Sequence, residues 1–173
     1  MHSVPQNLQG LFQSTKVLIV DDEFYTRKVV RTLLMAIGIS NIYNAEDGAS
    51  GLEAIQTIAP DVVLVDWEMP GMDGGAFVKA VRSPEEFPFP NVPIIMLTGH
   101  SERWRVIEAL RLGINEYLLK PVSSKTLLDR MIATLANPRP IVKVGKYYGP
   151  EPRKASPYKP VNEASLDDIA MVG

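Results

Sequence analysis

The sequence predicts an α/β protein with a doubly wound, five-stranded parallel sheet and helices on both faces. Three observations support this prediction. Five short apolar runs of strand length recur along the chain, and segments with helical periodicity separate them. Several runs end directly in a polar or charged residue, as buried parallel strands do where they reach the surface. Because parallel strands need crossover connections, such alternation leaves few other topologies.

The first three segments alternate as strand, helix and strand. The apolar run of residues 16–21 ends in two carboxylates and predicts a buried strand. Aliphatic residues between 29 and 37 recur with helical spacing, and Gly38 is a suitable helix stop. The short run 42–45 predicts the second strand.

The next segments continue the same alternation. A helical pattern covers 49–58 and is ended by Pro60. Residues 61–66 predict a third buried strand, followed by a glycine-rich turn and a helix over 75–82. Four prolines between 83 and 93 exclude regular structure there and predict a loop.

The last segments complete the predicted sheet. Residues 93–98 and 116–120 predict the fourth and fifth strands, with helices at 102–112 and 123–136. For such a series the flavodoxin-like strand order 2-1-3-4-5 is expected. The predicted domain therefore covers 16–136.

The remaining residues predict extensions of this domain. Residues 1–15 form an N-terminal extension, and 137–173 form a Pro-rich tail that is expected to be extended and to contain no separate output domain. The tail interleaves basic and tyrosine residues, which suits either a solvated linker or contact with nucleic acid or an acidic partner. The linker is favoured, and direct DNA binding is not.

Composition limits the classes of function. The chain has 173 residues, 46% of them hydrophobic, and a net charge of -2, which is typical of a soluble globular domain. The absence of cysteine excludes disulfides and thiolate chemistry. We see neither a signal peptide nor an apolar run long enough for a membrane span. A cytoplasmic protein that does not bind membranes is expected.

Polar side chains gather at one predicted edge of the sheet. In open parallel sheets, sites lie at the carboxyl ends of the strands near the switch in strand order. Three carboxylates meeting there would repel one another unless a cation bound among them, and their hard oxygens suit Mg²⁺. A carboxylate nucleophile, Mg²⁺, a hydroxyl and an ammonium together suit phosphoryl transfer. The residues at these strand ends are Asp21, Asp22, Asp66, Thr98 and Lys120.

These residues and their neighbours closely resemble a known family. The chain is similar to the receiver domain of bacterial two-component response regulators, of the single-domain, chemotaxis-regulator kind, over roughly residues 16–136. The likeness rests on the strand-end residues above and on three short motifs. These motifs are Met69-Pro70-Gly71-Met72-Asp73-Gly74 after Asp66, Thr98-Gly99-His100, and Lys120-Pro121.

The resemblance implies a role for each matching residue. Asp66 would be the phospho-acceptor and a Mg²⁺ ligand, and Lys120 the partner of the phosphoryl group. Thr98 would move to bind that group, and Tyr117 would rotate inward as the second switch residue. The remaining metal ligands would be Asp21, Asp22 and the backbone carbonyl of Glu68.

The resemblance also implies partners and a direction of signalling. The donor would be a sensor histidine kinase or a histidine phosphotransfer protein. The output would pass to an unknown downstream protein through the face formed by 102–112, 116–120 and 123–136, and a phosphorylation-dependent homodimer is left open. The protein would be regulatory, catalysing only its own phosphorylation and slow dephosphorylation. A cis peptide before Pro121 is expected.

Three other interpretations were weighed against this one. A receiver-like module that keeps the fold without the chemistry is disfavoured because every strand-end residue is intact. A Mg²⁺-dependent aspartyl phosphohydrolase of the haloacid-dehalogenase type needs Asp-x-Asp-x-Thr, which Asp66-Trp67-Glu68-Met69-Pro70 does not match. Tyr117 alone could be an ordinary core aromatic. His2 and His100 lack ligand spacing and are assigned no role.

Overall fold

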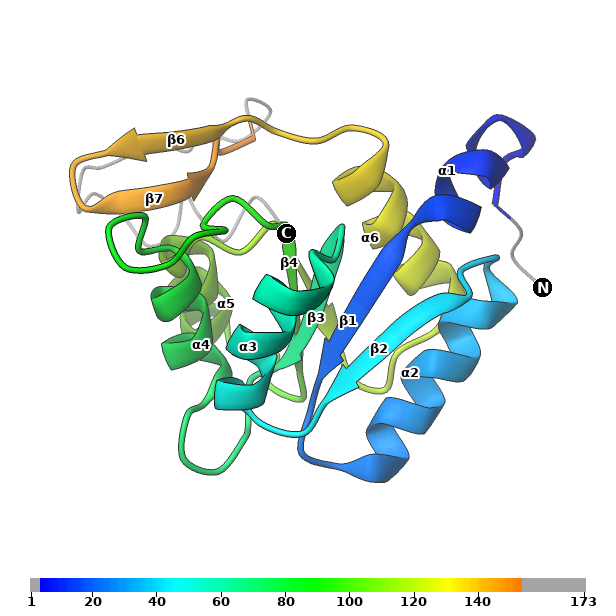
Figure 1. The fold of residues 1–173 in the computed structure, drawn as a ribbon, viewed down its shortest axis with the longest axis horizontal. Helices are drawn as coiled ribbons and strands as arrows, with labels where there is room; N and C mark the ends of the chain where they lie inside the picture. Colours follow the sequence, from blue (N-terminus) through cyan, green and yellow to red (C-terminus); the bar gives the residue numbers. More distant parts are fainter. Residues whose placement is uncertain (1–3, 154–173) are drawn as a thin grey trace.

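Five parallel strands form the central sheet of the computed structural model, which describes residues 4–153 (Figure 1). Their order is β2-β1-β3-β4-β5, as predicted. All neighbouring pairs in this sheet are parallel, so the carboxyl ends of the strands meet at one edge. The strands are β1 (Lys16–Val20), β2 (Asn41–Ala45), β3 (Val62–Asp66), β4 (Ile94–Thr98) and β5 (Glu116–Leu119).

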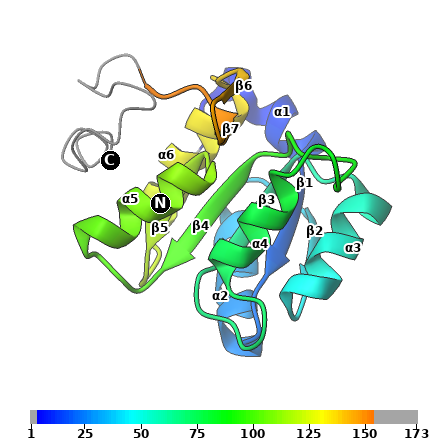
Figure 2. The same ribbon diagram turned by 90° about the vertical axis from the view of Figure 1, so that its left-hand side faces the viewer.

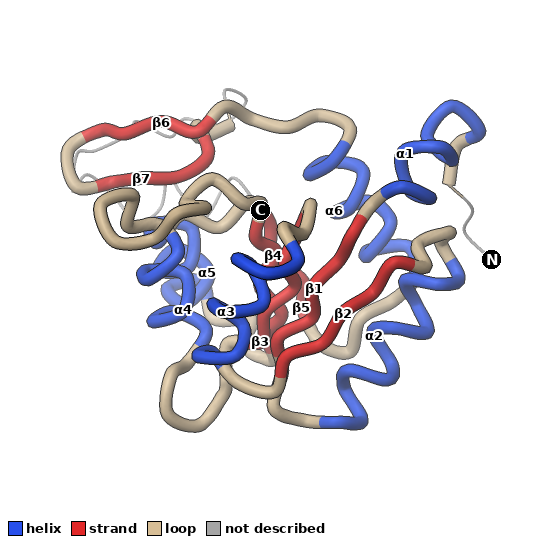
Figure 3. Tube along the Cα trace, in the orientation of Figure 1, coloured by secondary structure: helices blue, strands red, loops and turns tan. Residues whose placement is uncertain are grey.

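Helices cover both faces of the sheet (Figures 2 and 3). On one face lie α2 (Phe24–Ala36) and α6 (Ser124–Leu135), and on the other α3 (Gly48–Ile58), α4 (Gly74–Val81) and α5 (Arg103–Leu112). The doubly wound α/β prediction is confirmed.

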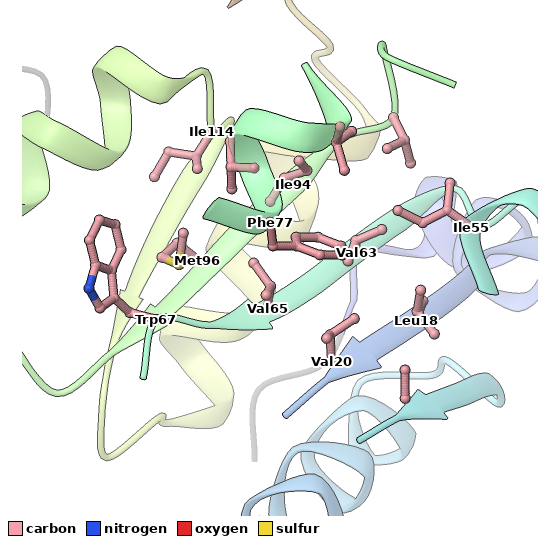
Figure 4. Packing of buried hydrophobic residues seen from close by; sticks show 14 of the residues in the cluster. Leu18, Val20, Ile55, Val63, Val65, Trp67, Phe77, Ile94, Met96 and Ile114 are labelled. Carbon is pink, nitrogen blue, oxygen red and sulfur yellow. The ribbon is translucent and has the colours of Figure 1, made fainter. Parts of the chain in front are cut away.

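The core consists of two apolar layers, one on each face of the sheet. Side chains alternate between the faces along each strand. Leu18 and Val20 of β1 therefore join the layer under α3, α4 and α5, while Val17 and Ile19 join the layer under α2 and α6. Figure 4 shows Phe77 in the first layer, among side chains from the neighbouring strands. Every residue of β3 and β4 is buried, which explains why their sequences are continuous apolar runs.

The N-terminal extension is partly helical. A 3-10 helix, η1 (Gln6–Leu8), leads into α1 (Gln9–Ser14), and Phe12 is fully buried in the layer under α2 and α6. The helix α2 also begins earlier than the predicted 29–37. Its first two residues, Phe24 and Tyr25, are 73% and 74% exposed, so they contribute nothing to the apolar stripe on which that prediction rested.

The expected extended tail is wrong for its first part. An antiparallel hairpin forms from β6 (Ile141–Val144) and β7 (Tyr147–Pro150), with Gly145 in the turn at a φ of +59°. The prolines do not break this hairpin because Pro140 precedes β6 and Pro150 is the last residue of β7. What the sequence predicted for the tail after Arg153 lies outside the described residues.

A buried arginine holds the Pro-rich loop of residues 83–93 and the end of α5 together. The Arg82 side chain donates to the carbonyl oxygens of Pro90, Val92 and Gly113 and to Oδ1 of Asn115, over 2.6–3.0 Å. Burial lowers the pKa of Arg82 to about 10, so this guanidinium remains charged at neutral pH. Among the described residues, no helix combines the length and apolar character that a membrane span requires.

Candidate functional site

The predicted site residues gather at the carboxyl edge of the sheet. Asp21 and Asp22 follow β1, and the amide of Asp21 donates to Ala45 O of β2 at 3.1 Å, which fixes the start of this loop. Asp66 is the last residue of β3, and Thr98 is the last residue of β4. These three strands, and β5, which Lys120 follows directly, therefore bring the predicted groups to the same edge of the sheet.

The three carboxylates form one cluster. One oxygen from each of Asp21, Asp22 and Asp66 lies within 4.8 Å of the others. Asp21 and Asp66 are buried, at 0% and 3% exposed, whereas Asp22 is exposed. The backbone N–H of Glu23 donates to Asp21 Oδ1 at 2.9 Å. The other carboxylate oxygen, Oδ2, is buried and has no hydrogen-bond partner.

Lys120 supplies the positive charge of the site. Its Nζ lies 2.9 Å from Asp66 Oδ1 and 3.9 Å from Asp21 Oδ2. Its backbone N–H donates to Thr98 O at 2.8 Å, which extends the pairing of β4 with β5 and orients the side chain toward the cluster. The Lys120–Pro121 peptide is cis, as the resemblance implied.

Burial changes the protonation of this cluster. Burial, together with the nearby charge of Asp66, raises the pKa of Asp21 to about 6, although a hydrogen bond from Glu23 opposes the rise. Burial also raises the pKa of Asp66, although the hydrogen bond and charge of Lys120 oppose the rise. For Lys120, burial lowers the pKa, but the contacts with Asp66 and Asp21 together outweigh it and leave the pKa raised.

These groups fit a divalent cation. A buried carboxylate oxygen without a partner is costly, and two further carboxylates lie close to it. An ion with hard oxygen ligands, such as Mg²⁺, would satisfy Asp21 Oδ2 and offset the mutual repulsion of the three acids. The three carboxylates that the sequence predicted as metal ligands therefore lie close enough together to hold such an ion.

The turn after Asp66 brings the backbone close to the site. The N–H of Gly74 donates to Trp67 O at 2.8 Å, and a Cβ at Gly74 would lie 2.6 Å from Asp66 O. Only glycine allows this approach. Asp73 then caps α4, since its Oδ1 accepts from Ala76 N at 2.8 Å.

The two candidate switch residues lie on neighbouring strands. Thr98 is 7% exposed, and its Oγ1 accepts from His100 N at 3.0 Å. Tyr117 of β5 is half-buried beside α6, where the Arg130 guanidinium lies 5.7 Å from the ring centroid. Arg130 Nε also donates to Tyr117 O at 3.2 Å.

The structure adds two contacts that the sequence did not predict. Arg27 of α2 is buried and donates from Nη1 to Asp21 O at 2.7 Å. His100, to which no role was assigned, contacts the Glu68 carboxylate through Nε2 beside the site. A signal existed for the second pair, since Glu68 and His100 each stand two residues after a strand-end residue of neighbouring strands.

Known proteins are similar to this chain in sequence and in fold. A family model described as the response regulator receiver domain matches residues 17–132. The chemotaxis protein CheY-3 of Vibrio cholerae is 36% identical over 121 residues, which cover 70% of this chain and 92% of that protein. The chemotaxis protein CheY of Pseudomonas aeruginosa is 34% identical over 116 residues, covering 67% and 92%.

The chain belongs to the response regulator receiver family.

Solved receiver structures agree with this assignment. A putative response regulator from Chloroflexus aurantiacus has a TM-score of 0.65 and 31% identity, covering 70% of this chain and 98% of that one. Chemotaxis protein CheY4 of Vibrio cholerae has a TM-score of 0.60 and 36% identity, covering 68% and 95%. This receiver domain is therefore a regulatory protein, a signalling switch of the two-component type, and its acidic pocket is of the kind that typically binds Mg²⁺ in the family.

Proposed function

We propose that this receiver domain accepts a phosphoryl group on Asp66 from a phosphohistidine of a sensor kinase or a phosphotransfer protein. The observation that carries the proposal is the 2.9 Å contact between Lys120 Nζ and Asp66 Oδ1, beside the buried Asp21 oxygen that lacks a hydrogen-bond partner. A carboxylate held between a fixed cation and a metal-binding pair of acids suits phosphoryl transfer.

In the proposed step, a carboxylate oxygen of Asp66 attacks the phosphorus of the donor. The bond from phosphorus to the donor imidazole nitrogen breaks, the electron pair of that bond goes to the imidazole, and aspartyl phosphate forms. Lys120 stays beside the phosphoryl oxygens and neutralises charge on them. Mg²⁺, when bound, would supply further charge neutralisation at these oxygens, held by Asp21, Asp22, Asp66 and the Glu68 backbone carbonyl.

The proposed response begins at Thr98. Its Oγ1 would leave the amide of His100 and donate a hydrogen bond to the phosphoryl group. Tyr117 would then turn inward into the space that Thr98 vacates, away from Arg130. The face made by α5, β5 and α6 would change shape and present a new surface to a downstream protein or to a second copy of the chain.

A phosphorylation-independent interaction module is the second candidate, and chemistry separates the two. Incubation with acetyl phosphate and Mg²⁺ should add the mass of one phosphoryl group to the wild-type protein, and Asp66→Asn should remain unmodified. Asp61→Asn is a matched control, because Asp61 lies at the opposite end of β3, where its Oδ2 accepts from Lys16 N at 2.8 Å. Equal modification of Asp66→Asn, or none of the wild type, would contradict the proposal.

A further inference from the structure

The segment after α6 lies outside the family match and folds back against the receiver domain. The receiver match ends at residue 132, whereas residues 139–153 continue into the hairpin β6–β7 and back. In Figures 1 and 2 this hairpin lies at the end of the sheet opposite the edge to which the strand arrows point. We call residues 139–153 the strap. Its contacts reach the start of β5, the end of α5 and the Pro-rich loop of residues 83–93.

Two arginines fasten the strap to the start of β5. Arg139 Nη2 donates to the backbone oxygen of Asn115 at 2.6 Å, and Arg153 Nη2 contacts the carboxylate of Glu116, whose side chain is 5% exposed. Arg139 also binds Glu151 O through Nη1 at 2.8 Å. The N–H of Glu151 donates to Pro140 O at 2.8 Å, so the two ends of the strap are tied to each other.

The strap also packs on the end of α5 through backbone atoms. A Cβ at Gly149 would lie 2.7 Å from the Cα of Gly113, and a Cβ at Gly113 would lie 2.6 Å from Tyr148 O. The Tyr148 hydroxyl donates to Oδ1 of Asn91 in the Pro-rich loop. Contacts this close leave little room for β7 to shift while α5 and β5 stay in place.

Buried polar contacts continue from the strap into the receiver domain. Asn115 accepts from Arg139 on its backbone oxygen and from Arg82 Nη2 on its side chain at 3.0 Å. The same Oδ1 of Asn115 accepts from Ile94 N at 2.9 Å, at the start of β4. The strap therefore contacts a buried hydrogen-bond network that includes the charged Arg82 side chain and lies at the starts of β4 and β5.

Opposite ends of β5 meet the strap and the proposed phosphorylation site. Asn115 precedes this strand, and Lys120, which contacts Asp66, follows it. The strand has only four residues, about 13 Å of extended backbone. Tyr117 lies between the two ends and pairs with Met96 of β4. A displacement of β5 at the strap end should therefore also move the residues at the end next to Lys120.

We propose that the strap is a regulatory restraint that couples the phosphorylation state of Asp66 to the packing of the C-terminal hairpin through β5. This inference rests on the proposed function. We call the contacts of Arg139 with Asn115 and of Arg153 with Glu116 the anchors of the strap. The anchors are formed in this structure, in which Thr98 Oγ1 accepts from His100 N. Phosphorylation, which draws Thr98 and Tyr117 inward, loosens the strap. By reciprocity, loss of the anchors favours phosphorylation.

The first test uses the wild-type chain and hydrogen exchange. Acetyl phosphate and Mg²⁺ should accelerate amide exchange in residues 139–151 by about fivefold, the lower range for coupled sites. Asp66→Asn under the same conditions should show no acceleration, and the edge strand β2 serves as an internal reference. Unchanged or slower exchange in a protein that carries the phosphoryl mass would overturn the restraint.

The second test uses variants of the anchors. Arg139→Ala and Arg153→Ala should each lower the acetyl phosphate concentration that half-phosphorylates the protein by about fivefold. Lys143→Ala is the matched control, because this strap residue meets only the exposed Glu85 carboxylate, at 3.7 Å, in the described contacts. Anchor variants that behave like Lys143→Ala would overturn the proposal.

The two proposals fail in different ways. A wild-type protein that takes up no phosphoryl group overturns the proposed function and the restraint together. A protein that is phosphorylated, but whose strap exchange and anchor variants show no response, overturns the restraint alone. If an anchor variant does not fold, the exchange experiment on the wild type decides.

Discussion

Asp21 shows how the site opposes folding at the level of a single side chain. Its carboxylate is fully buried, one of its oxygens has no hydrogen-bond partner, and its pKa is raised from 3.8 to about 6, mainly by burial. A raised pKa means that the folded protein prefers the protonated acid. The stability that this protonated acid contributes is therefore complete below pH 4 and is lost as the pH rises through 6, where the buried carboxylate becomes ionised.

Replacing this carboxylate should stabilise the metal-free protein. Without Mg²⁺ at pH 8, we expect Asp21→Asn to raise the free energy of unfolding by about 3 kcal/mol, as a pKa shift of this size implies. The gain should shrink as the pH falls to 4, because the wild-type acid is then protonated. Urea unfolding with EDTA at a series of pH values measures it.

Asp61→Asn provides the control for this prediction. Asp61 lies at the other end of the sheet and accepts from Lys16 N at 2.8 Å, so its replacement should not stabilise the protein. A destabilised Asp21→Asn variant at pH 8 would show that burial of the ionised Asp21 carboxylate does not oppose folding.

The site residues were predictable from the sequence because each stands at a strand end. The carboxyl end of a buried parallel strand can be located by the change from apolar to polar residues, as at Val20 and Asp21. The Arg82 network was not predictable. Its partners lie 8 to 33 residues away, and three of the four are backbone carbonyls, which leave no mark on the sequence.

At the level of elements, the junction of α5 with the hairpin makes two separate demands on one glycine. Gly113 ends α5 with a φ of +104°, in the left-handed region that favours glycine. Its missing Cβ also makes room for Tyr148 O of β7. One residue thus serves both the helix stop and the docking of the hairpin.

These two demands can be separated by a pair of substitutions. Gly38 ends α2 with a similar φ of +99°, but a Cβ there would meet only Val4, at 3.9 Å. Gly38→Ala should therefore cost about 1 kcal/mol of backbone strain, and Gly113→Ala should cost about 2 kcal/mol more by displacing the hairpin. Chemical denaturation and amide exchange in β7 distinguish the two. Equal costs would show that the hairpin is not held against Gly113.

Elements with strong periodicity were predicted closely, and those without it were missed. The helix α6 (Ser124–Leu135) lies within the predicted 123–136, because its apolar face is regular and Ser123 caps it. The hairpin was missed because its strands are only four residues long and half-exposed, and prolines surround them. The burial of Phe12 could not be predicted, since a helix of six residues shows little periodicity.

At the level of the whole molecule, the acidic cluster links stability to metal concentration. An ion that binds only the folded protein stabilises it by mass action. At 100 times the dissociation constant, Mg²⁺ should add about 2.7 kcal/mol and raise the melting temperature by roughly 5–10 °C. A potassium salt at the same ionic strength should produce neither increase. Thermal unfolding of the wild type and of Asp21→Asn measures this shift in melting temperature. The shift should be largely lost in the variant. A wild type whose melting temperature does not change with Mg²⁺ would contradict a metal site.

The burial of Trp67 gives the protein an optical reporter of its own. Its indole is 9% exposed and packs in the apolar layer one residue after Asp66, whereas Trp104 is 55% exposed beside Arg105. The tryptophan emission of a Trp104→Phe variant would therefore come only from Trp67, the residue that follows Asp66. Its fluorescence should change when Mg²⁺ is added and again with acetyl phosphate, and the second change should be absent after Asp66→Asn. Occupancy of the cluster could then be followed in real time without a label.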